Sequence, residues 1–293
     1  SFVAEADAPS AVYYNPAGLT QLKGSYATLG YVLEAPRFEY VSEATGDTVQ
    51  MQPQNFLIPH LYYVSDFSLE NLRFGFGAFS PYGLSTDWAN DSFSKYVMTE
   101  SDLQMFNLSP CVAYKVNDNV SVGVGGDYFI SHISKHKEIT PALSTGGDFQ
   151  LKGHDEGYGY NIGLLFKPSE TQNIGISYRS EIDLVYRGIV TLDNLNALYT
   201  GIMGNSTYTT AMESKSTIPR SIAVGYAYKP SEKWKVEFDI EWTDWSCVES
   251  EMITYPDESN TNRLAVLNSG NPTSRDWNDV FSYGFGAEYK AAD

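Results

Sequence analysis

The segment from residue 233 to residue 243, KWKVEFDIEWT, alternates almost without exception between polar and apolar residues. Because successive side chains of a β-strand point to opposite faces, this pattern predicts a strand with one apolar and one charged face. The apolar row is unbroken, and Trp234 and Trp242 stand at its two ends. Aromatic residues at both ends of an apolar row are typical of a strand that faces lipid between two membrane interfaces.

The same alternation recurs along the chain, with glycine, serine and charged residues on the polar parity. In the segment 173–187, Ile182 and Leu184 share the apolar parity with Ile174 and Ile176. Together with 233–243, the pattern predicts about ten strands, at about 25–34, 55–64, 72–80, 102–115, 120–130, 157–166, 173–187, 218–229 and 281–289.

The connections between these strands alternate in length. Short polar turns are expected near 65–71, 115–119, 167–172 and 229–232, and long loops near 35–54, 81–101, 137–153, 188–213 and 246–277. Short turns at one end and long loops at the other are typical of an outer-membrane β-barrel, which closes because lipid cannot satisfy free backbone groups. A soluble β-sandwich or β-solenoid is the alternative, but the polar faces suit a crowded lumen better than bulk water.

Composition excludes several other classes of protein. A net charge of −17 argues against nucleic-acid binding, which requires basic patches. No apolar run of about 18 residues predicts a transmembrane helix. The first residues lack the basic-then-apolar pattern of a signal peptide, so we expect a mature or trimmed chain. The two cysteines and four histidines do not have the spacing of a catalytic or zinc-binding motif. We therefore expect neither an enzyme nor a bound metal or other cofactor. A barrel enzyme with a catalytic set at its rim remains an open alternative.

An ordered series of motifs carries a resemblance to a known family. Glu5-Ala6-Asp7-Ala8 precedes Asn15-Pro16-Ala17-Gly18 and then a strand, and Pro81-Tyr82-Gly83-Leu84-Ser85-Thr86 follows a Phe-Gly-Phe-Gly strand. Similar correspondences occur at 102–108, 178–181 and 242–246. In this order the motifs resemble the FadL family of outer-membrane transporters of long-chain fatty acids and other hydrophobic compounds.

The resemblance implies an all-β fold, an antiparallel transmembrane barrel of fourteen strands with an N-terminal hatch in its lumen. Residues 1–24 would be part of the hatch and residues 25–293 the first ten strands. Since an open sheet would leave two bare edges in lipid, we expect four C-terminal strands and the first part of the hatch to be missing from this chain. The alternative is a smaller ten-stranded barrel, whose narrow lumen would hardly admit a hatch.

The implied function is passive uptake of hydrophobic molecules such as fatty acids or hydrocarbons in the outer membrane of a Gram-negative bacterium. The partners would be the hydrophobic ligand and outer-membrane lipid or detergent, and the protein would be a monomer. A hydrocarbon channel of the same family and a general porin or structural barrel are the alternatives.

Substrate capture is expected in the loop 188–213. Asp193 would lie in the first turn of a helix there and Gly204 would follow its last turn. Six apolar residues fall on one face of this helix: Leu192, Leu195, Leu198, Tyr199, Ile202 and Met203. In the family, helices in this region form a hydrophobic capture groove. The alternative is that this face only packs against the rim of the barrel.

A lateral exit is expected at the third strand, where the family has a kink that opens the barrel wall opposite the hatch. The residues concerned are Gly75, Gly77, Phe79, Pro81, Tyr82 and Gly83. Glycine permits a kink or bulge and proline cannot donate to the ladder, although Pro81 could merely end a strand. If the gap exists, the segment 10–20, which contains the motif Asn15-Pro16-Ala17-Gly18, should lie close beside it, with Gly18 allowing a tight turn.

The head group of a carboxylate ligand would require a cation. By strand parity, Ile133, Lys135 and Lys137 point inward, and Lys137 matches a basic family position near the ligand head group. A rim lysine facing solvent is the alternative. The second basic position of the family falls in 247–251, which contains no cation, and this absence weakens the expectation of a fatty acid.

Overall fold

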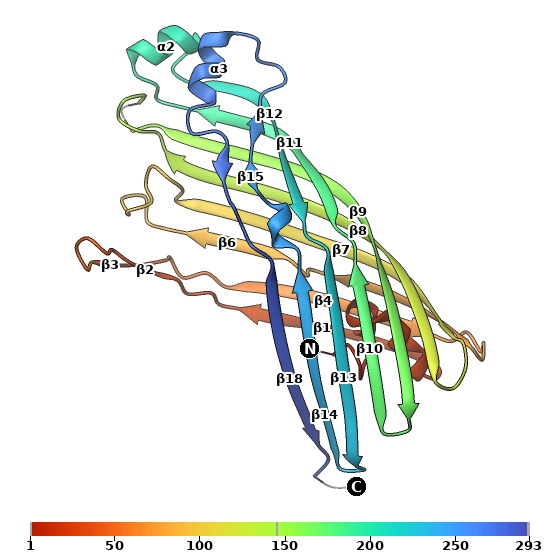
Figure 1. Ribbon diagram of the computed structural model, residues 1–293. Coiled ribbons are helices and arrows are strands. Elements are labelled where there is room, and N and C mark those ends of the chain that lie inside the picture. The colour runs from red at the N-terminus through yellow and green to blue at the C-terminus, as the bar shows by residue number, and fades with distance from the viewer. Residues whose placement is uncertain (1, 145, 292–293) are drawn as a thin grey trace.

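The strands form one large antiparallel sheet. The computed structural model describes residues 2–144 and 146–291. Ten strands follow one another as hydrogen-bonded neighbours (Figure 1): β1 (Ser25–Glu34), β4 (Phe56–Ser65), β5 (Leu72–Phe79), β7 (Glu100–Lys115), β8 (Val120–Glu138), β9 (Asp148–Ser169), β10 (Gln172–Arg179), β13 (Ser221–Ser231), β14 (Trp234–Thr243) and β18 (Val280–Tyr289). The predicted all-β antiparallel architecture is confirmed.

Four further strands belong to the same sheet but lie off this path. β6 (Gly83–Asp87) pairs with β7, β11 (Ile182–Leu192) pairs with β9, β12 (Tyr208–Ile218) pairs with β11, and β16 (Ile253–Thr254) pairs with β12. Two separate two-stranded sheets pair β2 (Glu39–Val41) with β3 (Thr48–Gln50) and β15 (Ser250–Glu251) with β17 (Thr273–Ser274).

The helices are short, and none of those described is part of the wall formed by the strands. α1 (Ala11–Tyr14) and the 3₁₀ helix η1 (Pro16–Gln21) precede β1, whereas α2 (Ala197–Met203), η2 (Trp245–Cys247) and α3 (Thr261–Leu267) belong to the long connections. α2 and α3 lie together beyond the strands, at the top of Figure 1. Within the described ranges, no helix has the length and hydropathy to span a membrane.

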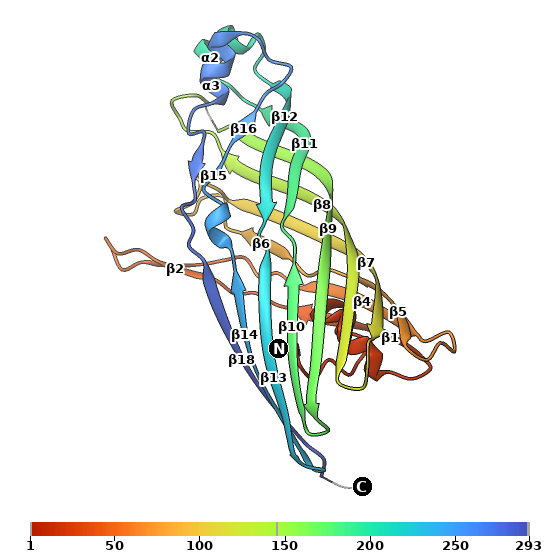
Figure 2. The same ribbon diagram turned by 45° about the vertical axis from the view of Figure 1, so that its right-hand side comes forward.

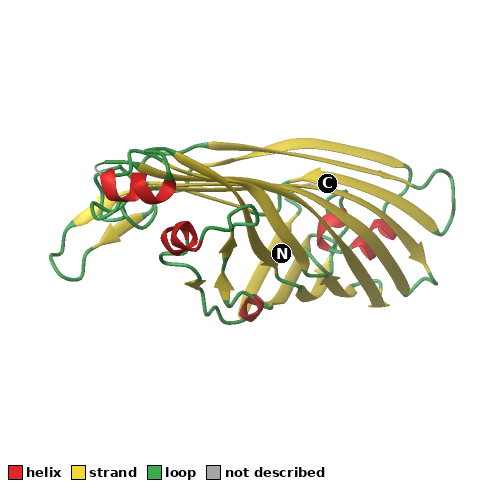
Figure 3. Cartoon of the chain, turned by 90° about the horizontal axis from the view of Figure 1, so that it is seen from above, coloured by secondary structure: helices red, strands yellow, loops and turns green. Residues whose placement is uncertain are grey.

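The sheet is strongly curved, as the view from above shows (Figure 3). Short turns join the strands at one end and the long connections gather at the other (Figure 2), as the sequence predicts. β1 and β18 are the two edges, and no pairing joins them in the described part of the chain. Closure of the barrel by four more strands therefore stays a prediction.

The outward face defines where a membrane would lie. On β9 the outward residues from Phe166 to Tyr158 are apolar or aromatic and exposed. The next outward positions toward the long connections are charged or polar, namely Glu156, His154 and Lys152. β8 changes in the same way between Ile130 and His132. Because a tilted strand crosses a bilayer in about 9–11 residues, β8 and β9, with 19 and 22 residues, extend well beyond it.

Several predicted boundaries are wrong. The segment 137–153 is only partly a loop, because β8 continues to Glu138 and β9 already begins at Asp148. The segment 188–213 is likewise partly strand, because β11 continues to Leu192 and β12 begins at Tyr208. The segment 173–187 is not one strand, since it breaks between β10 and β11 at Ser180-Glu181. The break reverses the parity, so that Ile182 and Leu184 are buried inward instead of facing lipid with Ile174.

Candidate functional site

Residues 2–24, here called the N-terminal segment, pack against the inner face of the sheet. Asn15 has an extended backbone (φ −162°), and its Oδ1 accepts the backbone N–H of Ala17 at 3.1 Å, which caps η1. Its Nδ2 donates to the carbonyl of Val3 at 2.8 Å and to the carbonyl of Leu164, on β9, at 3.1 Å. Pro16 occupies the first turn, where its missing N–H is not needed. The motif thus joins two parts of the segment to the wall.

Glycines on the inner face allow this close approach. A Cβ on Gly163 would lie 2.1 Å from Asn15 Oδ1, and one on Gly123 would lie 2.5 Å from the backbone nitrogen of Ala17. Gly18 serves the same purpose within the segment, since its Cβ would lie 2.3 Å from the carbonyl oxygen of Ala6. Gly18 lies in η1, so the expected role in a tight turn is replaced by one in packing.

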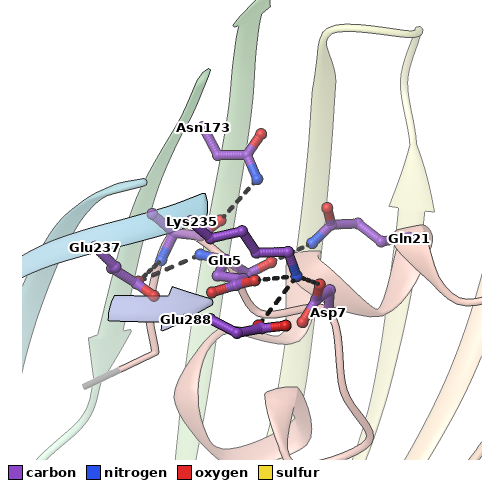
Figure 4. A network of polar contacts seen from close by, with 8 residues as sticks. Glu5, Asp7, Gln21, Asn173, Lys235, Glu237 and Glu288 are labelled. Atoms are coloured by element: carbon purple, nitrogen blue, oxygen red, sulfur yellow. Dashed lines mark hydrogen bonds and ion pairs between the residues drawn. The ribbon is translucent and has the colours of Figure 1, made fainter. Parts of the chain in front are cut away.

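Charged residues tether the start of the N-terminal segment to β14 and β18 (Figure 4). Lys235 Nζ contacts Glu5 at 2.5 Å, Asp7 at 3.1 Å and Glu288 at 3.5 Å. Glu237 accepts the backbone N–H of Ala4 at 2.8 Å. The polar row of the segment 233–243 therefore faces inward and binds the N-terminal segment.

A break in the third strand of the path opens the wall. β5 ends at Phe79 and β6 begins at Gly83, and both strands pair with β7. Ser80–Tyr82 therefore interrupt what would otherwise be one continuous strand beside β7. β4 pairs with β5 only at 61–65, and its residues 56–60 have no neighbour on that side in the described part of the chain. The opening between β4 and β6 is called the wall gap below.

A cavity of about 730 Å³ occupies the wall gap. Its lining includes Leu103 and Met105, on the inward parity of β7, as well as Gln104 and Phe106, on the outward parity. Tyr82 also lines it, and its ring centroid lies 6.2 Å from that of the buried Phe129. The cavity therefore reaches from the inner face of the sheet to the outer one.

The six residues expected at the lateral opening divide into two groups. Pro81, Tyr82 and Gly83 line the wall gap, and Phe79 ends β5 beside it. Gly75 and Gly77 lie in regular strand, paired with Cys111 and Ser109, and do not kink it. Both glycines leave room for the N-terminal segment, because a Cβ on either would lie 2.9–3.0 Å from the Val12 side chain. Since the strand resumes with the same partner, Pro81 does not merely end it.

The N-terminal segment lies beside the wall gap, as the sequence predicts. The ring of Tyr13, in α1, meets Phe79 edge to face at 5.3 Å between centroids. Phe79 in turn lies 5.5 Å from Tyr62 of β4. These three rings form the inner rim of the gap at the short-turn side.

The expected capture helix is shorter than predicted. Asn196 caps α2, which ends at Gly204 (φ 87°), so Leu192 and Leu195 precede the helix. Asp193 is likewise outside it, and its Oδ1 accepts the backbone N–H of Asp148 at 2.6 Å. Leu195 and Met203 are buried, at 6% and 2% exposure, whereas Leu198 is 68% exposed. Tyr199 and Ile202 are half-buried.

The two lysines differ in their surroundings. Lys135 forms an ion pair with Glu251 of β15, which also pairs with Arg275 at 2.7 Å. Burial alone would raise the pKa of the Glu251 carboxyl, but the two cations outweigh it and hold the pKa below its usual range. Lys137 has no carboxylate partner among the described residues, and burial lowers its pKa.

Lys137 lines an apolar cavity at the end with the long connections. The cavity has a volume of about 130 Å³, and its other lining residues include Leu143, Phe149, Leu192 and Leu195. The Lys137 ammonium lies 5.4 Å from the Phe149 ring centroid. The lining also includes Glu138, which pairs with Lys95 at 2.8 Å, so Lys137 is the charge of this cavity that has no ion-pair partner among the described residues.

The comparison with family models identifies the chain. Residues 2–293 match the family described as outer membrane protein transport protein (OMPP1/FadL/TodX). The chain belongs to the FadL family. This assignment confirms the resemblance seen in the sequence and the outer-membrane location in Gram-negative bacteria. It is a family of transport proteins and not of enzymes, as the sequence predicts.

Curated relatives of this FadL-family chain are distant. An outer-membrane protein of Neisseria meningitidis serogroup B is 24% identical over 99% of the chain and 70% of the relative. The long-chain fatty acid transport protein of Escherichia coli O6:H1 is 26% identical over 82% of the chain. The alignment covers 61% of that relative, so the chain spans well under its whole length.

Solved structures of FadL-family proteins share the fold. A Pseudomonas aeruginosa FadL homologue aligns with a TM-score of 0.77 over 98% of the chain and 73% of its own, at 14% identity. The Ralstonia pickettii toluene transporter TbuX aligns with a TM-score of 0.77 over 98% of the chain and 79% of the transporter, at 18% identity. At these identities the likeness shows the fold alone.

Two contacts of the inner face could not be predicted from the sequence. Arg179 of β10 pairs with the buried Asp127 of β8 at 2.8 Å, and the alternation predicts only that both side chains point inward. Glu251 lies in a segment without a cation, and no local pattern indicates that it neutralises Lys135. The glycine alternation was the available signal for the packing of the N-terminal segment.

Proposed function

We propose that the protein takes up hydrophobic molecules across the outer membrane and releases them sideways through the wall gap. The observation that carries this proposal is the cavity in the gap, which joins inward and outward residues of β7 beside the N-terminal segment. In this proposal residues 2–24 act as the hatch of a barrel formed by residues 25–293 and further strands.

An apolar ligand requires apolar stations along such a route. Each methylene group gains about 0.8 kcal/mol on leaving water, so a water-filled pore would offer the ligand no stabilisation. The exposed Leu198, with Tyr199 and Ile202, would provide the first contact outside. The cavity beside Lys137 would be the second station and the wall gap the exit. Leu192, Leu195 and Met203 would support the capture helix by packing beneath it.

Long-chain fatty acids are the substrate class that the site favours. Lys137 is the cation that would meet the carboxylate, because Lys135 is already neutralised by Glu251. Hydrocarbon uptake is a second candidate, since only one of the two expected lysines is free and the structural relative TbuX is a toluene transporter. Transport would be passive and would proceed in a monomer.

A charge placed in the wall gap tests the route. Leu84 of β6 lines the gap and is exposed, and Val97 is an exposed apolar residue of a loop that does not line it. Leu84→Asp should reduce uptake of a radiolabelled long-chain fatty acid by about tenfold, because an ionised carboxylate opposes passage of an apolar chain. Val97→Asp should leave uptake unchanged. Equal uptake by wild type and Leu84→Asp would show that ligands do not leave by this gap.

Conductance in planar bilayers separates the proposed transporter from a porin. An open lumen would carry a steady ion current, whereas a lumen filled by the N-terminal segment should carry little. Wild-type protein with high steady conductance would contradict the hatch.

A further inference from the structure

The outer face of the sheet carries a transverse row of polar side chains directly beyond its apolar surface. On β7 and β8 the last apolar outward residues toward the long connections are Phe106 and Ile130, which pair with each other. The next outward positions pair with one another across four adjacent strands, from β7 through β8 and β9 to β11: Gln104, His132, His154 and Arg187. These four residues are here called the outer row.

The first and last members of the outer row already have partners. Gln104 Nε2 donates to Asp102 Oδ2 at 2.7 Å, on the same strand. Arg187 Nε donates to Glu213 Oε1 at 3.1 Å, on the neighbouring β12. The guanidinium is therefore neutralised by a carboxylate of the protein, and neither end of the row offers a free positive charge to a ligand.

The middle of the outer row offers donors that lack acceptors. The rings of His132 and His154 lie 6.1 Å apart between centroids and 28° from parallel. Lys152, the next outward residue of β9 toward the long connections, is exposed like both histidines. Among the described residues, none of these three side chains has a hydrogen-bond or ion-pair partner. An imidazole donates at least one N–H in either protonation state, and an ammonium group donates three.

The same three side chains line one hollow on the outer face, here called the outer hollow. It has a volume of about 350 Å³, and Ser134 and Asp102 also line it. Asp102 pairs with Ser134, which pairs with Lys152, so β8 lies between the carboxylate and the ammonium. Because neighbouring strands lie about 4.8 Å apart, roughly 10 Å separate the two backbones. The hollow therefore presents unpaired donors, while its carboxylate already accepts from Gln104.

The outer hollow lies at the level of lipid head groups. On β8, His132 follows the outward Ile130 directly, so it stands roughly 5 Å beyond the apolar surface for a strand tilted by about 45°. The polar layer on each side of a bilayer is about 5–8 Å deep. Glu156, the outward residue of β9 nearer the apolar surface, accepts a hydrogen bond from Tyr128. Since the long connections of such barrels are extracellular, the head groups at this level belong to the outer leaflet.

We propose that His132, His154 and Lys152 bind a phosphate group of an outer-leaflet lipid. The inference goes beyond the proposed function and does not depend on the route of a transported ligand. The outer leaflet of Gram-negative bacteria consists of glycolipids with phosphorylated head groups, and a phosphate supplies the acceptors that these three donors lack. The hollow opens on the lipid side of the wall, so such a lipid reaches it without entering the lumen. Its acyl chains would lie against Phe106 and Ile130.

The test compares lipids that differ only in their phosphates. Full-length protein in detergent is titrated with diphosphorylated lipid A or with the dephosphorylated glycolipid, and bound lipid is counted by native mass spectrometry. The triple variant, His132→Phe with His154→Phe and Lys152→Met, keeps side-chain size and removes every donor of the site. Lys152→Met alone is the milder variant. Lys215→Met is the matched control, because Lys215 is an exposed outward lysine of β12 that does not line the hollow.

Wild-type protein should bind diphosphorylated lipid A about tenfold more tightly than the dephosphorylated form, because charge-assisted hydrogen bonds are the strong ones. The preference should disappear in the triple variant, fall several-fold in Lys152→Met and persist in Lys215→Met. Unchanged melting temperatures should show that the variants fold, since the substituted side chains are exposed.

Equal binding of the two lipids by the wild type would overturn the proposal. A folded triple variant that keeps the full preference for phosphate would overturn it as well. A parallel titration with a free long-chain fatty acid separates the two sources of an anionic head group. A triple variant that loses the fatty acid but keeps the phosphate preference would assign the three side chains to a ligand carboxylate instead.

Discussion

Glu251 forms an ion pair with Lys135 although 116 residues separate them along the chain. The pair joins β15, in the last long connection, to the far end of β8. It also neutralises one of the two lysines that could have met a ligand carboxylate, and it leaves Lys137 as the free one.

The first prediction concerns the pH dependence of this contact. The pKa of Glu251 is lowered in the folded protein, so the pair contributes stability fully above the usual glutamate value of about 4.3. That stability is lost as the pH falls through the lowered pKa. The protection factors of the amides of residues 249–255, which correct for the intrinsic pH dependence of exchange, should therefore fall only at acidic pH. In Glu251→Gln these protection factors should already be low at neutral pH, and equal protection in the two proteins would contradict the role of the pair.

Lys137 should bind the carboxylate of a fatty acid. Lys137→Met should weaken binding of a long-chain fatty acid by about tenfold, because a charge-assisted contact is lost in a dry pocket. Binding of an alkane of equal length should hardly change. Titration calorimetry or ligand fluorescence measures both, and Lys152→Met, an exposed lysine on the outer face, is the control. Equal loss for acid and alkane would indicate a packing role only.

Leu198 gives a cleaner test of capture than its neighbour Leu195. Leu195 is buried, and an aspartate there would destabilise the protein by about 2–5 kcal/mol whatever its role in uptake. Leu198→Asp should leave the melting temperature unchanged and reduce initial uptake of a hydrophobic ligand several-fold. Uptake equal to that of the wild type would show that this face of α2 does not capture ligands.

Two glycines of β8 and β9 form a matched pair. A Cβ on Gly163 would collide with Asn15, whereas one on Gly126 would meet nothing within 4 Å. Gly163→Ala should therefore cost about 1–3 kcal/mol and displace the N-terminal segment. Gly126→Ala should stay within about 0.5 kcal/mol of the wild type. Thermal unfolding and exchange of residues 10–22 measure the two effects, and equal behaviour would contradict the packing assigned to Gly163.

Asn15 should be required for the same packing. Asn15→Ala removes its bonds to Val3, Ala17 and Leu164 and leaves buried backbone groups without partners, at a cost of about 1–3 kcal/mol. Exchange of residues 2–24 should accelerate while that of β8 and β9 stays protected. Ser68→Ala, in an exposed turn, is the control. A segment equally protected in Asn15→Ala would show that the motif is not its anchor.

The strands and their faces could be read from the sequence because alternation is a local property. Ten strands follow the predicted order, and the row Trp234, Val236, Phe238, Ile240 and Trp242 faces outward as expected. The prediction failed where a local irregularity shifts the register. Ser180 and Glu181 reverse the parity of the following strand, and one shifted residue moves every later side chain to the other face.

Local sequence specifies the strands, the inward polar rows and the family motifs, since each depends on neighbours a few residues apart. The three-dimensional fold is needed to show that the wall opens at Ser80–Tyr82, that Gly75 and Gly77 leave room for Val12, and that Glu251 pairs with Lys135. These features depend on the register between strands and on the path of long connections. Such relationships join residues far apart in the chain, and no local pattern encodes which of them meet.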